Sequence, residues 1–154
     1  MLLYRGTPEP ECEPRPRDFP CIYFTPSFAV ARDYAAGPAP GWIQEYRVRT
    51  VALLDFSSQE AKVLGRVFAE DPNLGGNDLN DVLWGLFLYP TEDWVQFLQG
   101  NGYRGTKTSI EWCIWNPELI LTKQWRVEWR DGRWREEEIG PHCEDILGRA
   151  EKEL

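Results

Sequence analysis

The chain has 154 residues, a length that fits one domain able to bury a substantial core. Its 25 acidic and 17 basic residues give a net charge of −8, which argues against nonspecific binding to nucleic acid, because such binding draws on lysine and arginine contacts to phosphates. No apolar run approaches the roughly 20 residues that a membrane-spanning helix needs, and the first residues lead at once into Arg5 and a proline-rich stretch, so we expect neither a membrane segment nor a signal peptide.

The first quarter of the chain is predicted to form two strands and a helix. In order, these are a strand over 2–5, a proline-rich loop over 8–20, a strand over 21–24 and a helix over 26–36. Thr25 and Ser27 are both suitable N-caps for the helix, because a hydroxyl oxygen can accept a hydrogen bond from an unpaired N–H of the first turn.

The stretch 42–56 mixes apolar and polar side chains and is predicted to be rich in strand. Its first part, 42–50, carries charge on one face, whereas its second part, 52–56, is nearly all apolar. We therefore expect the second part to be the more buried of the two.

The remainder is predicted to contain three capped helices, short strands and a C-terminal hairpin, which makes the fold class α+β. The helices are expected over 59–69 with Ser57 or Ser58 as the cap, from Asp78 or Asn80 to about 87, and from Thr91 to 99, with a turn over 71–77. Strands are expected over 103–105, 110–115 and 119–121, before a hairpin of 125–130 and 133–137 around Asp131-Gly132 and a polar helix over 144–153.

Four cysteines and one histidine occur without any CxxC spacing, so no metal site is predicted. Free thiols and a cytoplasmic location are expected, and the alternative for the thiols is a disulfide between Cys21 and Cys113, whose strands should lie near each other. His142 precedes the last helix and is interpreted as structural. The hairpin tryptophans are interpreted as packing residues rather than a cofactor site: Trp125, Trp129 and Trp134.

Three separated segments carry polar residues on or beside strand-like runs. They are 3–7 (Leu-Tyr-Arg-Gly-Thr), 22–27 (Ile-Tyr-Phe-Thr-Pro-Ser) and 111–117 (Glu-Trp-Cys-Ile-Trp-Asn-Pro). In order and flanking pattern they resemble the NAD-cleaving site of ADP-ribosyltransferases, and residues 102–105 (Gly-Tyr-Arg-Gly) resemble the strand that often precedes the family's glutamate. The resemblance covers about 2–127. It implies a single domain over 1–154 with an ADP-ribosyltransferase-like split β-sheet core and flanking helices, extended by a hairpin and helix over 125–154.

The resemblance implies that Glu111 is the catalytic carboxylate, which would hold the ribose hydroxyls and stabilise the positive charge that develops when nicotinamide leaves. A carboxylate between Ile110 and Trp112 is also costly to bury unpaired, which favours a functional role. Arg5 would grip a phosphate or ribose of NAD with its fork of donors. The backbone of Gly6 would hold the nicotinamide carboxamide, because glycine permits close approach.

The second segment is implied to supply Tyr23, which would stack on the nicotinamide ring. Thr25 and Ser27 would hydrogen-bond the catalytic carboxylate or the ribose, although helix capping alone also explains both hydroxyls. Thr7 and Tyr34 are further implied NAD-binding residues. The implied catalytic set is therefore Glu111, Arg5, Tyr23 and Thr25.

Two positions depart from the family's pattern. Transferases that modify arginine usually carry Glu or Gln two residues before the catalytic glutamate, where this chain has Ser109. Position 5 is Arg rather than the His of the poly-ADP-ribose polymerase type, so chain elongation is not expected.

The function implied is that of an NAD-dependent mono-ADP-ribosyltransferase, a glycosyltransferase acting on a macromolecule, with protein favoured over nucleic acid as acceptor. A bacterial or phage toxin or effector is implied, working in the cytoplasm or in a host cytoplasm, with an antitoxin or immunity protein as a partner and neither metal nor membrane. The alternatives are an NAD glycohydrolase, with water as acceptor, and a non-catalytic binding module that retains the fold. Transfer of a 2′-phosphate from RNA is disfavoured, because the chain offers few basic residues for an RNA groove.

Overall fold

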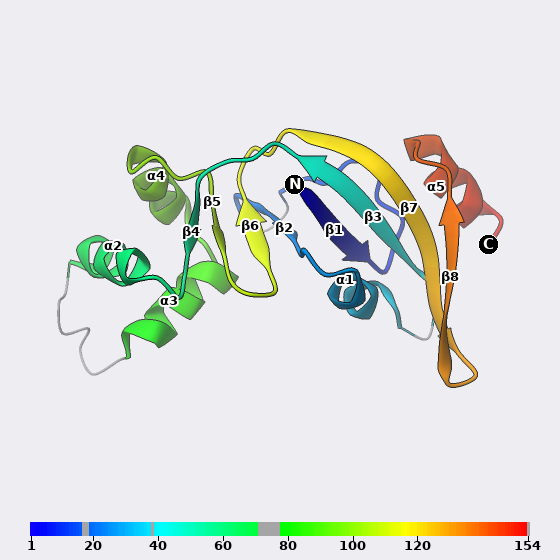
Figure 1. Ribbon diagram of the computed structural model, residues 1–154, viewed down its shortest axis with the longest axis horizontal. Coiled ribbons are helices and arrows are strands. Elements are labelled where there is room, and N and C mark those ends of the chain that lie inside the picture. Colours follow the sequence, from blue (N-terminus) through cyan, green and yellow to red (C-terminus); the bar gives the residue numbers. More distant parts are fainter. Residues whose placement is uncertain (17–18, 38, 71–77, 154) are drawn as a thin grey trace. The chain divides into compact units, whose positions relative to one another are not determined.

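The chain divides into two compact units in the computed structural model, which describes residues 1–16, 19–37, 39–70 and 78–153. Unit 1 comprises Met1–Pro14, Phe24–Arg49 and Pro117–Leu154, and unit 2 comprises Arg15–Tyr23 and Thr50–Asn116. The described residues form five helices and two four-stranded sheets, neither of them closed, so the architecture mixes α and β (Figure 1). Among the helices of these ranges, none combines the length and apolar character needed to cross a membrane.

The sheet of unit 1 is antiparallel throughout, in the order β1-β3-β7-β8 (Figure 1). Its strands are β1 (Leu2–Thr7), β3 (Gly41–Val48), β7 (Leu119–Arg130) and β8 (Arg133–Ile139). The predicted hairpin is confirmed: Asp131 and Gly132 both have positive φ, at 54° and 75°, as a two-residue turn between twisted strands requires. The strands predicted over 119–121 and 125–130 are one continuous strand, β7.

The two faces of the unit 1 sheet differ in polarity, one being apolar and the other carrying buried glutamines. Neighbouring residues on a strand contribute to opposite faces, because their side chains alternate in direction. Ile43 and Trp125, which are register partners, join the apolar cluster against α1 (Phe28–Ala35). Gln44 and Gln124, the next register pair, hydrogen-bond to each other and to backbone carbonyls next to α5 (Cys143–Glu151) and in the loop after β1.

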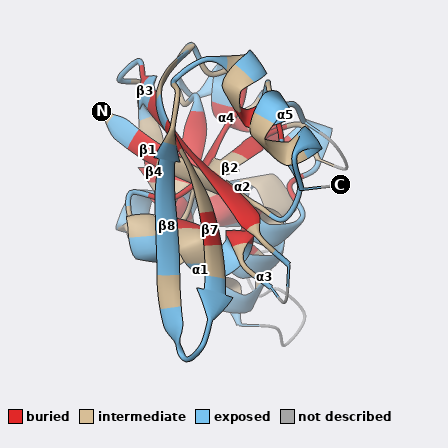
Figure 2. Ribbon diagram, turned by 90° about the vertical axis from the view of Figure 1, so that its right-hand side faces the viewer, coloured by how far each residue is buried: buried red, intermediate tan, exposed pale blue. Residues whose placement is uncertain are grey.

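The expectation about burial within 42–56 was wrong. In β3 every residue except Arg47 is buried, whereas in β4 (Leu53–Asp55) only Leu54 is buried. The cause is position in the sheets: β3 is an inner strand covered on both faces, and β4 is an edge strand. Figure 2 shows the contrast within unit 1 between β3, which is buried along most of its length, and the edge strand β8, which is mostly exposed.

The sheet of unit 2 has the order β2-β6-β5-β4. Its other strands are β2 (Ile22–Phe24), which contains the boundary between the units, β5 (Gly105–Lys107) and β6 (Trp112–Ile114). The strands predicted over 103–105 and 110–115 are therefore displaced or shorter than expected. β4 and β5 are parallel, and the chain between them forms the helices α2 (Gln59–Ala69), α3 (Leu79–Leu88) and α4 (Glu92–Gly100).

The helix starts follow the predicted caps. The side chains of Ser58, Asp78 and Thr91 accept hydrogen bonds from the backbone at Ala61 (3.1 Å), Asn80 (2.7 Å) and Trp94 (3.2 Å). Each bond satisfies an N–H that the helix itself cannot pair. The turn predicted over 71–77 lies outside the described residues. The apolar faces of these helices converge on a core formed by Leu54, Ala61, Leu83, Phe87, Trp94, Leu98 and Trp115.

Candidate functional site

Arg5, on β1, forms an ion pair with a carboxylate of its own unit. Its Nε donates to Oε2 of Glu11 at 3.1 Å and its Nη2 donates to Oε1 at 3.3 Å. The two side chains are only 16% and 8% exposed. This two-point contact is the geometry that an arginine fork would otherwise offer to a phosphate, so any anion bound by Arg5 must compete with Glu11.

Close packing of α1 against β1 requires glycine at position 6. A Cβ at this position would lie 1.8 Å from the backbone oxygen of Ala31 on α1, so only glycine lets the helix lie this close to β1. Thr7 follows at the end of β1, paired with Trp42 of β3. The glycine is therefore accounted for without a ligand.

The second motif segment lies directly beside the first. Tyr4 and Thr25 exchange both backbone hydrogen bonds, at 2.8 and 2.9 Å, in an isolated antiparallel bridge. Thr25 is buried, and its Oγ1 accepts the backbone N–H of Ser27 at 3.1 Å. Ser27 is the N-cap of α1 and accepts from Val30 at 3.3 Å, so both hydroxyl oxygens support the start of this helix. Tyr34, further along α1, is 55% exposed.

Tyr23 ties β2 to the end of α3 in unit 2. Its hydroxyl donates to the carbonyl of Phe87, and its ring meets the Phe87 ring edge-on at 5.7 Å. Burial raises the pKa of Tyr23 well above its ordinary value, and the neighbouring thiols of Cys113 and Cys21 raise it further. The side chain is therefore a neutral donor fixed against the core.

Glu111 stands in a tight turn just before β6. The Thr108 N–H donates to the Glu111 carbonyl at 2.8 Å, and the Glu111 N–H donates to Oγ1 of Thr108 at 3.0 Å. The strand begins only at Trp112, and Ile110 is 49% exposed. The premise that Glu111 lies inside a buried strand was therefore wrong: its side chain is half-buried and borders solvent.

The residues predicted from the sequence to form one site are divided between the two units. Unit 2 holds Tyr23 on β2 and Glu111 before β6, and these strands are neighbours in one sheet. Unit 1 holds the remaining predicted residues: Arg5, Gly6, Thr7, Thr25, Ser27 and Tyr34. Within unit 1 the first two motif segments are hydrogen-bonded neighbours, as described above.

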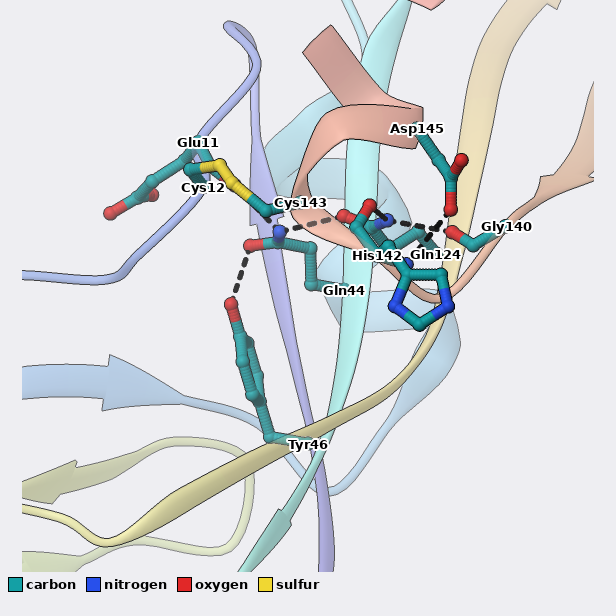
Figure 3. The surroundings of a disulfide bond; sticks show 9 residues. All are labelled: Glu11, Cys12, Gln44, Tyr46, Gln124, Gly140, His142, Cys143 and Asp145. Atoms are coloured by element: carbon teal, nitrogen blue, oxygen red, sulfur yellow. Dashed lines mark hydrogen bonds between the residues drawn. A yellow bond between two sulfur atoms is a disulfide. The ribbon is translucent and has the colours of Figure 1, made fainter.

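The cysteines do not all remain thiols. Cys12 and Cys143 form a disulfide, with their Cα atoms 5.0 Å apart, so the expectation of free thiols was wrong for this pair (Figure 3). Cys21 and Cys113 are free and buried, and the alternative bridge between them is not formed. The bonded pair is separated by 131 residues in sequence, and no local spacing motif connects them.

A polar network lies beside this disulfide. Nε2 of Gln44 donates to the Glu11 carbonyl at 2.6 Å and to Oε1 of Gln124 at 3.0 Å (Figure 3). Nε2 of Gln124 donates in turn to the carbonyls of Gly140 and His142, both at 2.7 Å. The network fixes the loop after β1 and the start of α5 to the sheet, which is a structural role. Among the described residues no group of three or more histidine, cysteine or carboxylate side chains could hold a metal ion.

Sequence reasoning missed a hollow of roughly 440 Å³ in unit 1. We call it the hairpin pocket, and its lining residues are Asp33, Ala36, Gly37, Trp129 and Trp134. The register implied by an Asp-Gly turn already pairs Trp129 with Trp134, as observed. The contribution of α1 could not be found this way, because the helix is about a hundred residues away in sequence.

Comparison with known proteins finds no matching family model, no similar curated protein and no similar solved structure.

Proposed function

We propose that the protein cleaves the bond between nicotinamide and ribose in NAD and transfers ADP-ribose to a macromolecular acceptor. The basis is the resemblance of the three motif segments to ADP-ribosyltransferases. The structural observation that supports it most directly is the backbone pairing of Tyr4 with Thr25, because this isolated bridge brings parts of the first two segments side by side.

The chemistry assigns the central role to Glu111. As the nicotinamide leaves, positive charge develops on the ribose, and a carboxylate at the ribose hydroxyls stabilises it. A half-buried side chain that borders solvent, in a backbone turn fixed by Thr108, suits this task because the backbone that carries it is held in place. The acceptor that we propose is a protein, in the manner of a bacterial or phage toxin or effector, with an antitoxin or immunity protein as the partner that restrains it.

Arg5 would bind a phosphate of NAD, and in this proposal the phosphate displaces the carboxylate of Glu11 from the guanidinium. Both ligands accept two parallel hydrogen bonds, so the exchange conserves the geometry of the fork. Arg5→Lys keeps the charge and loses the fork, and we expect it to raise KM for NAD roughly tenfold while kcat changes less.

One observation favours a second candidate, a non-catalytic binding module. The Arg5–Glu11 ion pair is nearly buried and well formed, which is also what a purely structural arginine would show. In that case the protein has no activity toward NAD.

Release of nicotinamide from NAD, measured with and without added cell protein, separates the candidates. Release that depends on added protein, with ADP-ribose found on that protein by mass spectrometry, supports the transferase. Equal release without any acceptor identifies an NAD glycohydrolase, and no release under either condition identifies the binding module.

Glu111→Gln is the decisive variant, and we expect it to lower kcat about 100-fold or more. Glu118→Gln is the matched control, because Glu118 is an exposed glutamate in a surface ion pair with Arg49. Equal rates for the two variants would remove Glu111 from the mechanism.

A further inference from the structure

In the hairpin pocket, aromatic rings, a carboxylate and a helix end meet within a single unit. Trp129 and Trp134 are cross-strand partners with ring centroids 5.2 Å apart, and Trp129 is 52% exposed. Large aromatic side chains exposed at a concave site commonly mark a binding surface. Asp33, from the last turn of α1, lines the same hollow.

The hairpin already binds one guanidinium from the chain itself. Arg32 lies over the Trp134 ring, with its Cζ 4.7 Å from the centroid, and its Nη1 donates to Oε1 of Glu136 at 2.6 Å. This is a cation–π contact completed by a carboxylate on the same hairpin. The hairpin pocket contains a second set of the same groups, the Trp129 ring and the Asp33 carboxylate.

The electrostatics of the pocket favour a cation. Asp33 is an acidic residue in the last turn of α1, where the helix dipole is itself negative and disfavours a carboxylate. Ala36 and Gly37, which follow the helix end, also line the pocket. No ion pair involving Asp33 occurs among the residues that the structure describes, and Arg32, the basic residue of the same turn, is paired with Glu136 instead.

Glutamates of β8 add negative charge beside the pocket, one of them in the ion pair with Arg32. Side chains at alternate positions of β8 share a face, so Glu136 and Glu138 lie on the face of Trp134. The whole chain carries a net charge of −8, which attracts basic partners over longer distances.

We propose that the hairpin pocket binds an arginine side chain from a basic segment of a partner protein. The guanidinium stacks on the Trp129 ring and donates to the Asp33 carboxylate, as Arg32 does with Trp134 and Glu136. Arginine rather than lysine is the occupant, because a planar guanidinium can stack and donate in its plane at the same time. The inference is independent of the proposed NAD chemistry and involves none of the residues assigned to it.

Binding of a short peptide of alternating arginine and glycine tests the inference, by calorimetry and by the shifts of the tryptophan indole N–H resonances. We expect binding at physiological ionic strength, with the Trp129 and Trp134 resonances shifting most. A peptide with citrulline at each arginine, which keeps the shape and removes the charge, should not bind. A peptide with lysine at the same positions should bind more weakly.

Two variants probe the pocket and two serve as controls. Trp129→Ala and Asp33→Asn should each weaken binding roughly 5- to 30-fold. Trp84→Ala removes another tryptophan of similar exposure, on α3 in unit 2, and Glu138→Gln removes a charge on the pocket's own face but outside the pocket. Both controls should bind nearly as the parent chain does.

Several results would overturn the inference. They are absence of peptide binding, equal binding of the citrulline peptide, equal binding of the lysine peptide, and a loss on Glu138→Gln as large as that on Asp33→Asn. The last would show diffuse attraction between charges instead of a site. Circular dichroism of each variant separates a loss of binding from a loss of folding.

Discussion

Unit 2 buries tryptophan and phenylalanine rings against one another, whereas unit 1 buries glutamines against backbone carbonyls. In unit 2, Trp94 is 1% exposed and its ring contacts those of Phe68 and Phe97. In unit 1, Gln44 and Gln124 are 1% and 0% exposed, and each amide group is hydrogen-bonded.

The difference teaches which changes each unit should tolerate. Apolar packing is non-directional and loses stability in proportion to the volume removed. A buried polar network depends on every partner being present, because a donor or acceptor left unpaired carries its full desolvation penalty. The aromatic core of unit 2 should therefore respond to the size of a substitution, and the glutamine network of unit 1 to its hydrogen-bonding capacity.

The largest effect is expected from Trp94→Ala in unit 2. Removing a fully buried indole leaves a cavity beside Phe68 and Phe97, and we expect the free energy of unfolding to fall by about 3–5 kcal/mol. Denaturant unfolding followed by circular dichroism measures the change. Trp84→Ala, where the ring is 48% exposed, should cost less than about 1 kcal/mol. Equal losses from the two variants would contradict an apolar core centred on Trp94.

The next effect is expected from breaking the Cys12–Cys143 disulfide in unit 1. The bond closes a loop of 131 residues, and removing such a constraint from the unfolded chain costs about 2–4 kcal/mol. Cys12→Ser should lower the thermal midpoint accordingly, and reductant should lower that of the parent chain to a similar value.

Thiol labelling provides the control for this bond. The denatured, oxidised parent chain should react with iodoacetamide only at Cys21 and Cys113, and the reduced chain at those two and at Cys12 and Cys143 as well. Labelling of all four cysteines before reduction would show that the Cys12–Cys143 disulfide is not formed.

The helices and the hairpin could be predicted from sequence, because their determinants are local. Ser58, Asp78 and Thr91 each precede an apolar helical face and each accepts the expected capping bond. The Asp-Gly pair at 131–132 sets the register of β7 and β8 for the same reason. Where one turn of chain contains both the donor and the acceptor, the sequence is sufficient.

Features that depend on distant partners could not be predicted. Gln44 is buried because Gln124, 80 residues away, and the carbonyl of Glu11 receive its N–H groups. Arg5 was assigned to NAD from its motif, but nothing in that motif indicates that the loop after β1 returns Glu11 to its guanidinium. Ile110 suggested a buried strand around Glu111, and its exposure shows that apolar residues in a short run need not be buried.

A smaller effect is expected from Gln124→Met in unit 1. Methionine fills a similar volume but leaves the carbonyls of Gly140 and His142 without their donor, and Gln44 without an acceptor. We expect a loss of about 1–3 kcal/mol, measured by denaturant unfolding. Gln99→Met, at an exposed position on α4, should change stability by less than about 0.5 kcal/mol. A tolerated Gln124→Met would mean that unit 1 responds to size, as unit 2 does.

The smallest effect concerns the charged contact between Glu153, which follows α5, and Arg126 on β7. Nη2 of Arg126 lies 3.1 Å from Oε2 of Glu153, and the hydrogen bond lowers the pKa of that carboxyl below its ordinary value. A lowered pKa in the folded state means that the contact stabilises the fold above the unfolded pKa, near 4.3. The stabilisation is lost as the pH falls through the lowered folded value.

Glu153→Gln should therefore cost up to about 1 kcal/mol at neutral pH and almost nothing in strong acid, because the side chains are partly exposed. Unfolding measured at both pH values gives the difference, with Glu151→Gln, an exposed neighbour on α5, as the control. A loss for Glu153→Gln that is the same in acid as at neutral pH would mean that the charge of Glu153 does not stabilise the helix end. In that case, polar interactions would stabilise unit 1 only through its buried glutamine network. The two units would then differ in their interiors and not at their surfaces.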